Sequence, residues 1–378
     1  MNILVLASNP PDTSPGSRFR IEQWAKILAS QGFTFTYVPF DDERLYGVLY
    51  APGKLGAKAM GMVRGFMRRI ALLREVSNYD AVFVYQEASR IGPAILERMI
   101  AKKRPLIFDF CDPIYLPPPP DSTGNQRFRF LKFVNKTKTI CGVSAHVLVG
   151  NEELAAYARQ FSRNVTVVPI TIDMEEYPPR HASLDPSVPP VIGWTGSYST
   201  VPHLETARAA LKKLGTIRKY EMKVMGTEEF SLAGVPSSAE SWKSDREIPF
   251  LHLCDIGIMP LPDDPWVKLR SHLKVRQFMA VGVPCVASPV GIISELIQDG
   301  VNGFLATSEE EWIEKLSKLI DDPELRTEMG KKARVAIAEK YSGRIWAQTV
   351  ASILRKASGN LDEIALHSSA PSARRRSA

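Results

Sequence analysis

The most concentrated set of reactive side chains lies in VKLRSHLK, residues 267–274. Lys268, Arg270 and Lys274 surround Ser271, which we expect to be the N-cap of the following helix. Cations and the positive end of a helix both attract anions, so this turn predicts a site for a diphosphate. The alternative, a solvated surface turn, is disfavoured because the helix runs into the apolar sequence FMAVGVPCVAS, which should be buried.

A second candidate is GWTGS, residues 193–197, where small residues follow a strand. Gly193 and Gly196 let the backbone approach a ligand closely, and the hydroxyls of Thr195 and Ser197 offer donors to phosphate oxygens. An ordinary strand-to-helix turn explains the same residues equally well. SPVG, residues 288–291, is a third small-residue loop of this kind.

The first half of the chain offers carboxylates and cations. Asp109 and Asp112 follow an apolar strand, and Asp112 is the better candidate for orienting or deprotonating an acceptor hydroxyl. A carboxylate before Pro113 is also a common turn residue, so that alternative stays open. Arg18 and Arg20 could approach a diphosphate from the opposite wall, although Arg18 equally suits the surface of a helix start.

These residues must be positioned by an α/β framework, because apolar strands alternate with amphipathic helices. A helix is expected from about Phe19, with Gly32 as its C-cap, and the first domain ends near Tyr177. The alternation favours a parallel sheet with helices on both faces. The strands expected in this half are 2–7, 33–38, 81–85, 106–110, 146–149 and 165–169.

The same alternation recurs after a proline-rich segment, residues 178–190, which we interpret as an interdomain linker. Helices are expected from about His203 to a stop at Gly215, and after Asp321. The chain is therefore predicted to form two Rossmann-like domains, 1–177 and 191–345. In the second domain, strands are expected at 191–195, 220–225, 255–260 and 284–287, and a helix at 271–281. A further helix at 346–357 is expected to return to the first domain. Residues 358–378 are expected to form a disordered basic tail.

Composition excludes several classes of protein. With 378 residues, 44% of them hydrophobic and 24% charged, the chain is expected to be a packed globular protein.

No apolar run reaches the length of a membrane span, and the first residues lack the basic region of a signal peptide, so we expect a cytoplasmic protein. Its net charge of +7 favours an anionic partner, but nucleic acid ranks last because only net charge supports it. The four cysteines lack metal-ligand spacing, which predicts buried thiols and no metal.

Residues 54–76 form a basic amphipathic segment. Six Lys and Arg residues stand against one acidic residue and alternate with Met60, Val63, Met67 and Ile70. Such a helix can lie on an anionic membrane, which would place the protein peripherally on its inner face. The alternative is a helix whose apolar stripe packs on the domain while its charges face water.

Residues 255–306 carry motifs in a specific order. An acidic strand start is followed by PLPDD, the basic turn, MAVGVP, ASPVG and DGVNGFLA. This order closely resembles the donor-binding half of retaining GT-B glycosyltransferases, particularly glycosyltransferase family 4. The likeness extends through SRFRIEQWAKIL, FDFCDPIYLP, VGNEELAAYA and IGWTGS to DDPELRTEMGKKARVAIAEKYS, and so covers nearly the whole chain.

The resemblance implies an α/β, GT-B architecture: two facing Rossmann-like domains with a central cleft. It implies a hexosyltransferase of polysaccharide biosynthesis that moves a sugar from a nucleotide diphosphate-sugar to a hydroxyl of a glycan, lipid-linked saccharide or small molecule, with retention, without a metal and without a cofactor. The implied catalytic residues are Asp112, Arg270 and Lys274. The implied donor-binding residues are Gly16, Ser17, Arg18, Gly196, Ser197, Gly226, Trp242, Ser271, His272, Gln277, Gly291 and Glu295.

One departure from the family pattern keeps other functions open. Many members carry a pair of glutamates just before the Met-Ala-x-Gly segment, where this chain has Leu269 and Gln277. Gln277 can still hydrogen-bond a ribose hydroxyl, whereas Leu269 cannot. A non-catalytic nucleotide-sugar-binding partner subunit and a sugar-nucleotide epimerase are the alternatives, and an NAD-dependent oxidoreductase is disfavoured because GxGxxG is missing from both repeated units.

Overall fold

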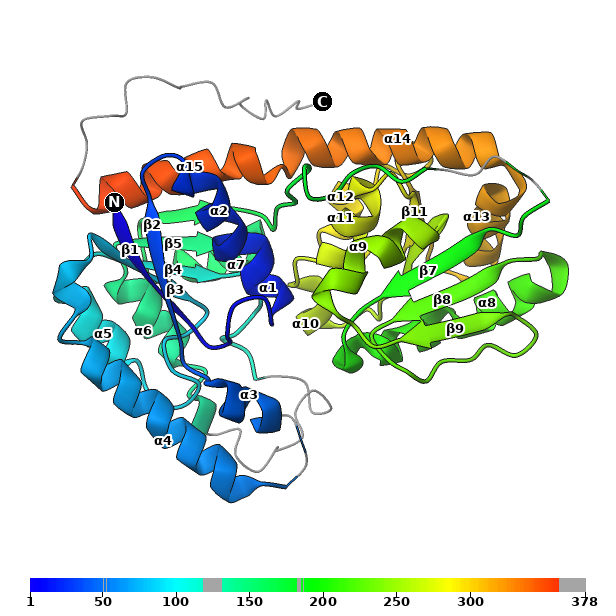
Figure 1. Ribbon diagram of the computed structural model, residues 1–378. Helices are drawn as coiled ribbons and strands as arrows, with labels where there is room; N and C mark the ends of the chain where they lie inside the picture. Colours follow the sequence, from blue (N-terminus) through cyan, green and yellow to red (C-terminus); the bar gives the residue numbers. More distant parts are fainter. Residues whose placement is uncertain (50, 52, 118–130, 182–184, 186, 360–378) are drawn as a thin grey trace.

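Two parallel sheets of six strands each form the framework of the protein (Figure 1). The computed structural model describes residues 1–49, 51, 53–117, 131–181, 185 and 187–359. The first sheet has the order β2-β1-β3-β4-β5-β6 and the second the order β12-β11-β10-β7-β8-β9. Each sheet belongs to one half of the chain, so the predicted pair of α/β domains in a GT-B arrangement is confirmed.

The strands of the first sheet are β1 (Asn2–Ala7), β2 (Thr34–Pro39), β3 (Ala81–Tyr85), β4 (Leu106–Phe110), β5 (His146–Val149) and β6 (Val165–Val167). Those of the second are β7 (Val191–Thr195), β8 (Glu221–Met225), β9 (Ser237–Glu240), β10 (Ile256–Met259), β11 (Cys285–Ala287) and β12 (Phe304–Leu305). The central strands β3 and β4 are buried along their whole length. Strands covered on both faces need continuous apolar runs, which is why AVFVY and LIFDF were recognisable in the sequence.

Helices cover the faces of both sheets (Figure 1). In the first half they are α1 (Pro15–Ser17), α2 (Gln23–Ala29), α3 (Glu43–Leu49), α4 (Leu55–Leu72), α5 (Ile95–Ala101), α6 (Lys136–Val143) and α7 (Glu152–Ala158). In the second half they are α8 (Glu205–Ile217), α9 (Ser244–Leu253), α10 (Pro265–Lys268), α11 (Leu273–Ala280), α12 (Ile293–Leu296), α13 (Glu309–Asp321), α14 (Pro323–Lys340) and α15 (Gly343–Ala357).

The last two helices connect the domains (Figure 1). Helix α14 packs on α11 in the second domain, and α15 packs on α2 in the first. The chain crosses near Ser342, which pairs with Ile172. A guanidinium N–H of Arg334 donates to the Tyr177 carbonyl (2.6 Å) and ties α14 to the end of the first domain. Residues 360–378 of the expected tail (358–378) and four positions of the expected linker (178–190) lie outside the described residues.

Several expected boundaries were wrong. Gly215 does not stop its helix, because α8 continues to Ile217 and buries Leu211 and Leu214 against the sheet. The short strands β9 and β12 were not expected, because SSAE is mostly polar and FL is only two residues long.

Arg20 does not face the cleft, contrary to expectation. Its guanidinium is fully buried and pairs with Asp109 at 2.5 Å, and a second N–H donates to the Val168 carbonyl at 2.6 Å. Arg20 has non-helical backbone angles (φ −127°, ψ −109°) inside a π-helical turn, Arg18–Glu22, which leads into α2. The pair therefore joins the start of α2 to β4.

We expect Asp109→Asn to destabilise the protein by about 3 to 5 kcal/mol, because Arg20 would remain buried without its counter-charge. The midpoint of urea unfolding, followed by tryptophan fluorescence, measures this change. Glu152→Gln is the matched control, since its partner Arg159 lies at the surface, and it should change stability by less than about 0.5 kcal/mol. Equal midpoints for the two variants would contradict the structural role of Asp109.

Candidate functional site

A cavity of about 370 Å³ lies between the two domains. The first domain contributes the loop after β1 and the loop after β4, and the second contributes the loops after β7, β8 and β10. Ligands of parallel α/β sheets bind at these carboxyl ends of strands. The polar residues that line the cavity include Thr13, Tyr46, Asp112, Thr195, Ser197, Thr200, His203, Trp242, Arg270, Ser271, His272 and Lys274, with Gly16, Gly196 and Gly226.

Close backbone packing forms the floor on the side of the second domain. Gly226 follows β8 with φ of +129°, and a Cβ at this position would lie 2.5 Å from the Gly196 carbonyl oxygen. Both the conformation and the space therefore require glycine at position 226. The two loops that follow β7 and β8 consequently meet backbone to backbone at the edge of the cavity.

The basic turn is held by contacts with the first domain, and its predicted N-cap was wrong. Helix α11 begins after His272, whose backbone is left-handed (φ 45°, ψ 53°), and not after Ser271. The Ser271 hydroxyl instead donates to the Cys111 carbonyl (3.0 Å), and the Asn151 amide donates to the Leu269 carbonyl (2.9 Å). The turn is thus fixed against the loops after β4 and β5.

Two of the three cations in this turn line the cavity. Arg270 Nε lies 3.3 Å from Asp112 Oδ1, so the two residues predicted to be catalytic form an ion pair between the domains. Lys274 Nζ lies 3.6 Å from Glu247 Oε2. Lys268 does not line the cavity, because it is half exposed and pairs with Asp263 at 2.6 Å.

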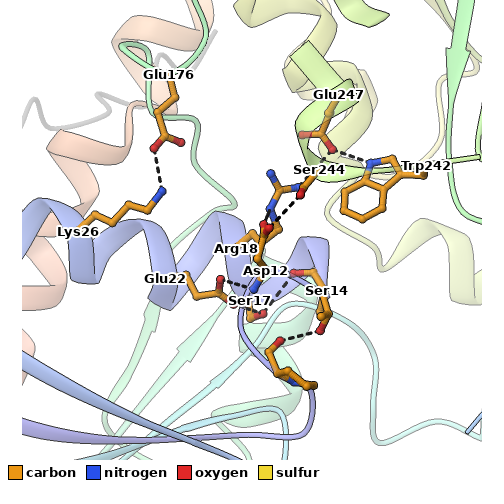
Figure 2. Close-up of polar contacts among 12 residues, drawn as sticks. Asp12, Ser14, Ser17, Arg18, Glu22, Lys26, Glu176, Trp242, Ser244 and Glu247 are labelled. Carbon is orange, nitrogen blue, oxygen red and sulfur yellow. Dashed lines mark hydrogen bonds and ion pairs between the residues drawn. The ribbon is translucent and has the colours of Figure 1, made fainter. Parts of the chain in front are cut away.

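Glu247, on α9, is a buried carboxylate that gathers cations and donors from both domains (Figure 2). Arg18 Nη1 lies 3.4 Å from Oε2, and the Trp242 indole N–H donates to the same oxygen at 2.8 Å. The Arg18 guanidinium also lies over the Trp242 ring, 5.4 Å from its centroid. Asp12 pairs with Arg18 at 2.8 Å and accepts from the Ser244 hydroxyl at 2.9 Å, which adds a second contact across the cleft.

The other oxygen of Glu247 accepts from two buried groups. The Tyr177 hydroxyl donates at 2.6 Å and the Gln277 amide at 2.5 Å. Gln277 is fully buried and does not line the cavity, so its predicted contact with a ribose hydroxyl is wrong. Its amide supports Glu247 because the side chain points from α11 into the interface between α9 and the end of the first domain.

The charged groups at the cavity shift one another's pKa values. Burial alone would raise the pKa of Glu247, but Lys274 and Arg18, together with the hydrogen bonds from Tyr177 and Trp242, hold that pKa below its ordinary value. Burial lowers the pKa of Lys274, and Glu247 opposes this shift. Burial, followed by the charges of Arg270 and Arg276, lowers the pKa of His272 to about 3, so the imidazole is neutral near pH 7.

Four buried polar atoms at the cavity have no hydrogen-bond partner within the described parts of the chain. They are the Trp194 indole nitrogen, the Thr195 hydroxyl oxygen, Nε2 of His272 and Nζ of Lys274, whose ion pair with Glu247 is 3.6 Å long. Unpartnered buried polar groups are rare in folded proteins because each forfeits its hydration. A polar ligand in the cavity would satisfy them.

Four further predicted site residues lie away from the cavity lining. The Ser17 hydroxyl donates to Glu22 at 2.6 Å, and Arg18 acts through Glu247 and Trp242 (Figure 2). Gly291 has φ of +57°, and a Cβ there would lie 2.2 Å from the Lys268 carbonyl, so this glycine packs beneath the basic turn. Glu295 is exposed on α12.

Sequence reasoning missed Glu247, Tyr177 and Trp194. The first two lie in segments without a recognisable motif, and only the packing of α9 against the first domain brings them together. Trp194 lies within GWTGS, but the argument from glycines and hydroxyls did not use its indole. Over the described residues, no cluster of three or more His, Cys, Asp or Glu side chains could hold a metal ion.

Comparison with known proteins finds similarity to glycosyltransferases in part of the sequence and in the fold. Residues 273–336 match the family described as glycosyl transferases group 1. D-inositol 3-phosphate glycosyltransferase of Pseudarthrobacter chlorophenolicus is 29% identical over 140 residues, which span 34% of this chain and only 31% of that relative.

Several solved structures are similar over 94% of this chain, and two of them serve as examples. Sucrose-phosphate synthase of Thermosynechococcus elongatus aligns over 99% of its own chain with a TM-score of 0.67 and 14% identity. HepE of Anabaena, solved in complex with UDP-glucose, aligns over 100% of its own chain with a TM-score of 0.65 and 16% identity. At such identities the likeness establishes the shared fold.

Glu247→Gln should lower stability by about 3 kcal/mol at pH 7, because Lys274 and Arg18 lose a buried counter-charge. A carboxyl whose folded-state pKa is depressed stabilises above its ordinary pKa of about 4.3, and this contribution disappears as the pH falls through the folded-state value. The difference in melting temperature between wild type and variant should therefore be constant above about pH 5 and narrow below it.

Melting curves of both proteins from pH 7 to acid measure that difference. Glu221→Gln is the control, because Glu221 is exposed on β8 and lies 3.7 Å from Lys223. If the difference in melting temperature between Glu247→Gln and wild type persisted at low pH, the assigned ion pairs of Glu247 with Lys274 and Arg18 would be contradicted.

Proposed function

Because residues 273–336 carry the glycosyl transferases group 1 segment and the chain has the GT-B fold, we propose that this protein is a glycosyltransferase using a nucleotide diphosphate-sugar. The observation that carries the proposal is the cavity between the domains. It combines the cations Arg270 and Lys274 and unpartnered buried polar groups on one wall with the carboxylate of Asp112 on the other.

The two cations suit the leaving group. When the bond between the anomeric carbon and the diphosphate breaks, its electron pair stays on a β-phosphate oxygen. Lys274 and Arg270 would stabilise this developing charge, and the unpartnered polar group of Thr195 would contact further oxygens of the donor. Since the cations are fixed before reaction, they act without reorganisation in the transition state. This arrangement supports a mechanism without a metal ion.

Asp112 faces the cations from the first domain. Its two oxygens are held by Arg270 at 3.3 Å and by the Gln86 amide at 3.3 Å. We assign it to orienting an acceptor hydroxyl, whose oxygen bonds to the anomeric carbon while its proton passes to the departing phosphate or to Asp112. Attack from the face that the phosphate leaves would retain the configuration at that carbon. The acceptor would be a glycan, a lipid-linked saccharide or a small molecule.

The donor would lie along the second domain. Its nucleobase would occupy the region of Gly226 and Trp242, and His272 would offer a neutral ring to a sugar or ribose hydroxyl. The UDP-glucose held by HepE, which shares the fold, supports a donor of this class. The bound sugar and base are not specified by this likeness.

A non-catalytic nucleotide-sugar-binding subunit is the second candidate. Leu269 occupies a position where many family members carry a glutamate, and only its backbone carbonyl takes part in the turn. Gln277 is buried beneath Glu247 and is not available to a ligand. Such a subunit would bind the donor tightly without transferring or hydrolysing the sugar.

A thermal-shift panel of UDP-, GDP-, ADP- and dTDP-sugars tests donor binding. One donor should raise the melting temperature, because a ligand at about 100 times its dissociation constant adds about 2.7 kcal/mol of stability. Product analysis by NMR with that donor should then show a retained anomeric configuration, with the same rate in EDTA. Stabilisation without transfer or hydrolysis would favour the binding subunit, and no stabilisation by any donor would contradict both candidates.

Lys274→Ala and Arg270→Ala should each lower turnover by about 100-fold to 1,000-fold, because each removes a fixed charge from the developing phosphate anion. Lys268→Ala is the matched control: it belongs to the same turn but points away from the cavity, so its turnover should remain close to that of wild type. Steady-state rates with circular dichroism spectra measure both activity and fold. Unchanged turnover in Lys274→Ala would reject its role.

A further inference from the structure

Helix α4 (Leu55–Leu72) exposes an apolar row along its outer face. Met60, Val63, Met67 and Ile70 are 58%, 57%, 62% and 53% exposed. Their spacing of three, four and three residues places them on one side of a helix, and we call them the outer stripe. The helix lies at the edge of the first domain (Figure 1), and no residue of the outer stripe lines the cavity between the domains.

Polar contacts hold the opposite face inward. The buried guanidinium of Arg69 donates to three backbone carbonyls, those of Val38 and Ala88 at 2.7 Å and of Ala7 at 3.0 Å. The Lys58 ammonium donates to the Ala51 carbonyl at 2.6 Å. Turning the stripe into the domain would break these bonds and leave a buried guanidinium without partners.

Two glycines let the inner face of α4 approach the domain closely. A Cβ at Gly61 would lie 2.8 Å from the Leu45 side chain, and a Cβ at Gly65 would lie 2.7 Å from Phe40. Phe66 and Leu72 pack on the core of the first domain from the same helix, so α4 already has an inward apolar face. The outer stripe is a second apolar face, and the alternative in which Met60, Val63, Met67 and Ile70 pack on the domain is wrong.

The charge around the outer stripe is positive. Helix α4 contains no Asp or Glu between Leu55 and Leu72. Arg64 and Arg68 are partly exposed along one edge, each 3.3 Å from the partly buried Asp42, while Lys54 and Arg74 are exposed beyond the two ends. Apolar side chains bordered by cations match a surface that is apolar within and anionic at its boundary.

We propose that the outer stripe of α4 docks on an anionic phospholipid bilayer. Met60, Val63, Met67 and Ile70 would enter the boundary between headgroups and acyl chains, while Lys54, Arg64, Arg68 and Arg74 contact lipid phosphates. Among the described helices, none is long and apolar enough to cross a bilayer, so docking would be interfacial. This inference stands apart from the proposed transfer reaction and does not depend on it.

A second copy of the chain fits the stripe less well. A twofold pairing of α4 with α4 would place two helices without acidic residues against each other, and the like charges would repel. A bilayer containing anionic lipid instead supplies the complementary charge. The observations therefore favour lipid as the occupant.

The test is flotation of the full chain with vesicles of phosphatidylcholine alone or mixed with phosphatidylglycerol. We expect binding to the mixed vesicles that weakens as salt is added, because the lipid charges become screened. The double variant Val63→Gln, Met67→Gln should bind at least about tenfold more weakly. The matched control Ile217→Gln, Val335→Gln makes the same change at side chains that are 51% and 54% exposed on other helices, and it should bind like wild type.

Three results would overturn the proposal. The first is equal binding of the wild type to both kinds of vesicle. The second is an equal loss of vesicle binding in the stripe variant and in the control variant. The third is that the wild type does not bind vesicles and light scattering shows it to be a dimer, while the stripe variant is a monomer. Thermal stabilisation by a sugar nucleotide should be the same in wild type and the stripe variant, since the stripe is remote from the cavity. That measurement shows that the variant is folded and separates failure of lipid docking from failure of the proposed transferase activity.

Discussion

The buried carboxylate of Glu247 is the interaction on which the candidate site depends. It lies where α9 meets the end of the first domain, and it remains charged because Lys274 and Arg18 compensate for its lost hydration. Tyr177 and Trp242 complete its hydrogen bonds. These partners come from both domains. The relative position of the two domains and the charges at the cavity are therefore linked through the Glu247 carboxylate.

Buried arginines organise the first domain in a related way. Arg20 ties the start of α2 to Asp109 on β4, and Arg69 ties α4 to three backbone carbonyls. In both cases a buried guanidinium donates several hydrogen bonds to fixed partners. The helical segment that carries it is therefore held in one orientation about its axis. Arg20 thereby fixes β4, whose following loop lines the cavity, whereas Arg69 fixes the orientation of α4 in which the outer stripe is exposed. The sequence alone does not show that Arg69 is buried while apolar side chains of the same helix are exposed.

The framework of the protein was readable from local pattern. Strands such as Ala81–Tyr85 and Leu106–Phe110 were predicted to the residue because a strand buried on both faces is nearly continuously apolar, and Asp109 is the one charged residue in these two runs. Glycine stops were less informative: Gly215 lies inside α8, where the buried leucines around it outweigh its weak preference against helix. The edge strand Ser237–Glu240 was missed because it is only half covered and its sequence is polar.

The sequence by itself determined two α/β domains, a basic turn after β10 and a family likeness, since strand periodicity and motif order are local properties of the chain. It also placed Arg270 and Asp112 on opposite domains. Only the tertiary structure decided that Gln277 lies buried beneath Glu247 and that Lys268 points away. Burial and ion pairing depend on residues distant in the sequence, and a side chain's chemistry follows from the partners that packing provides.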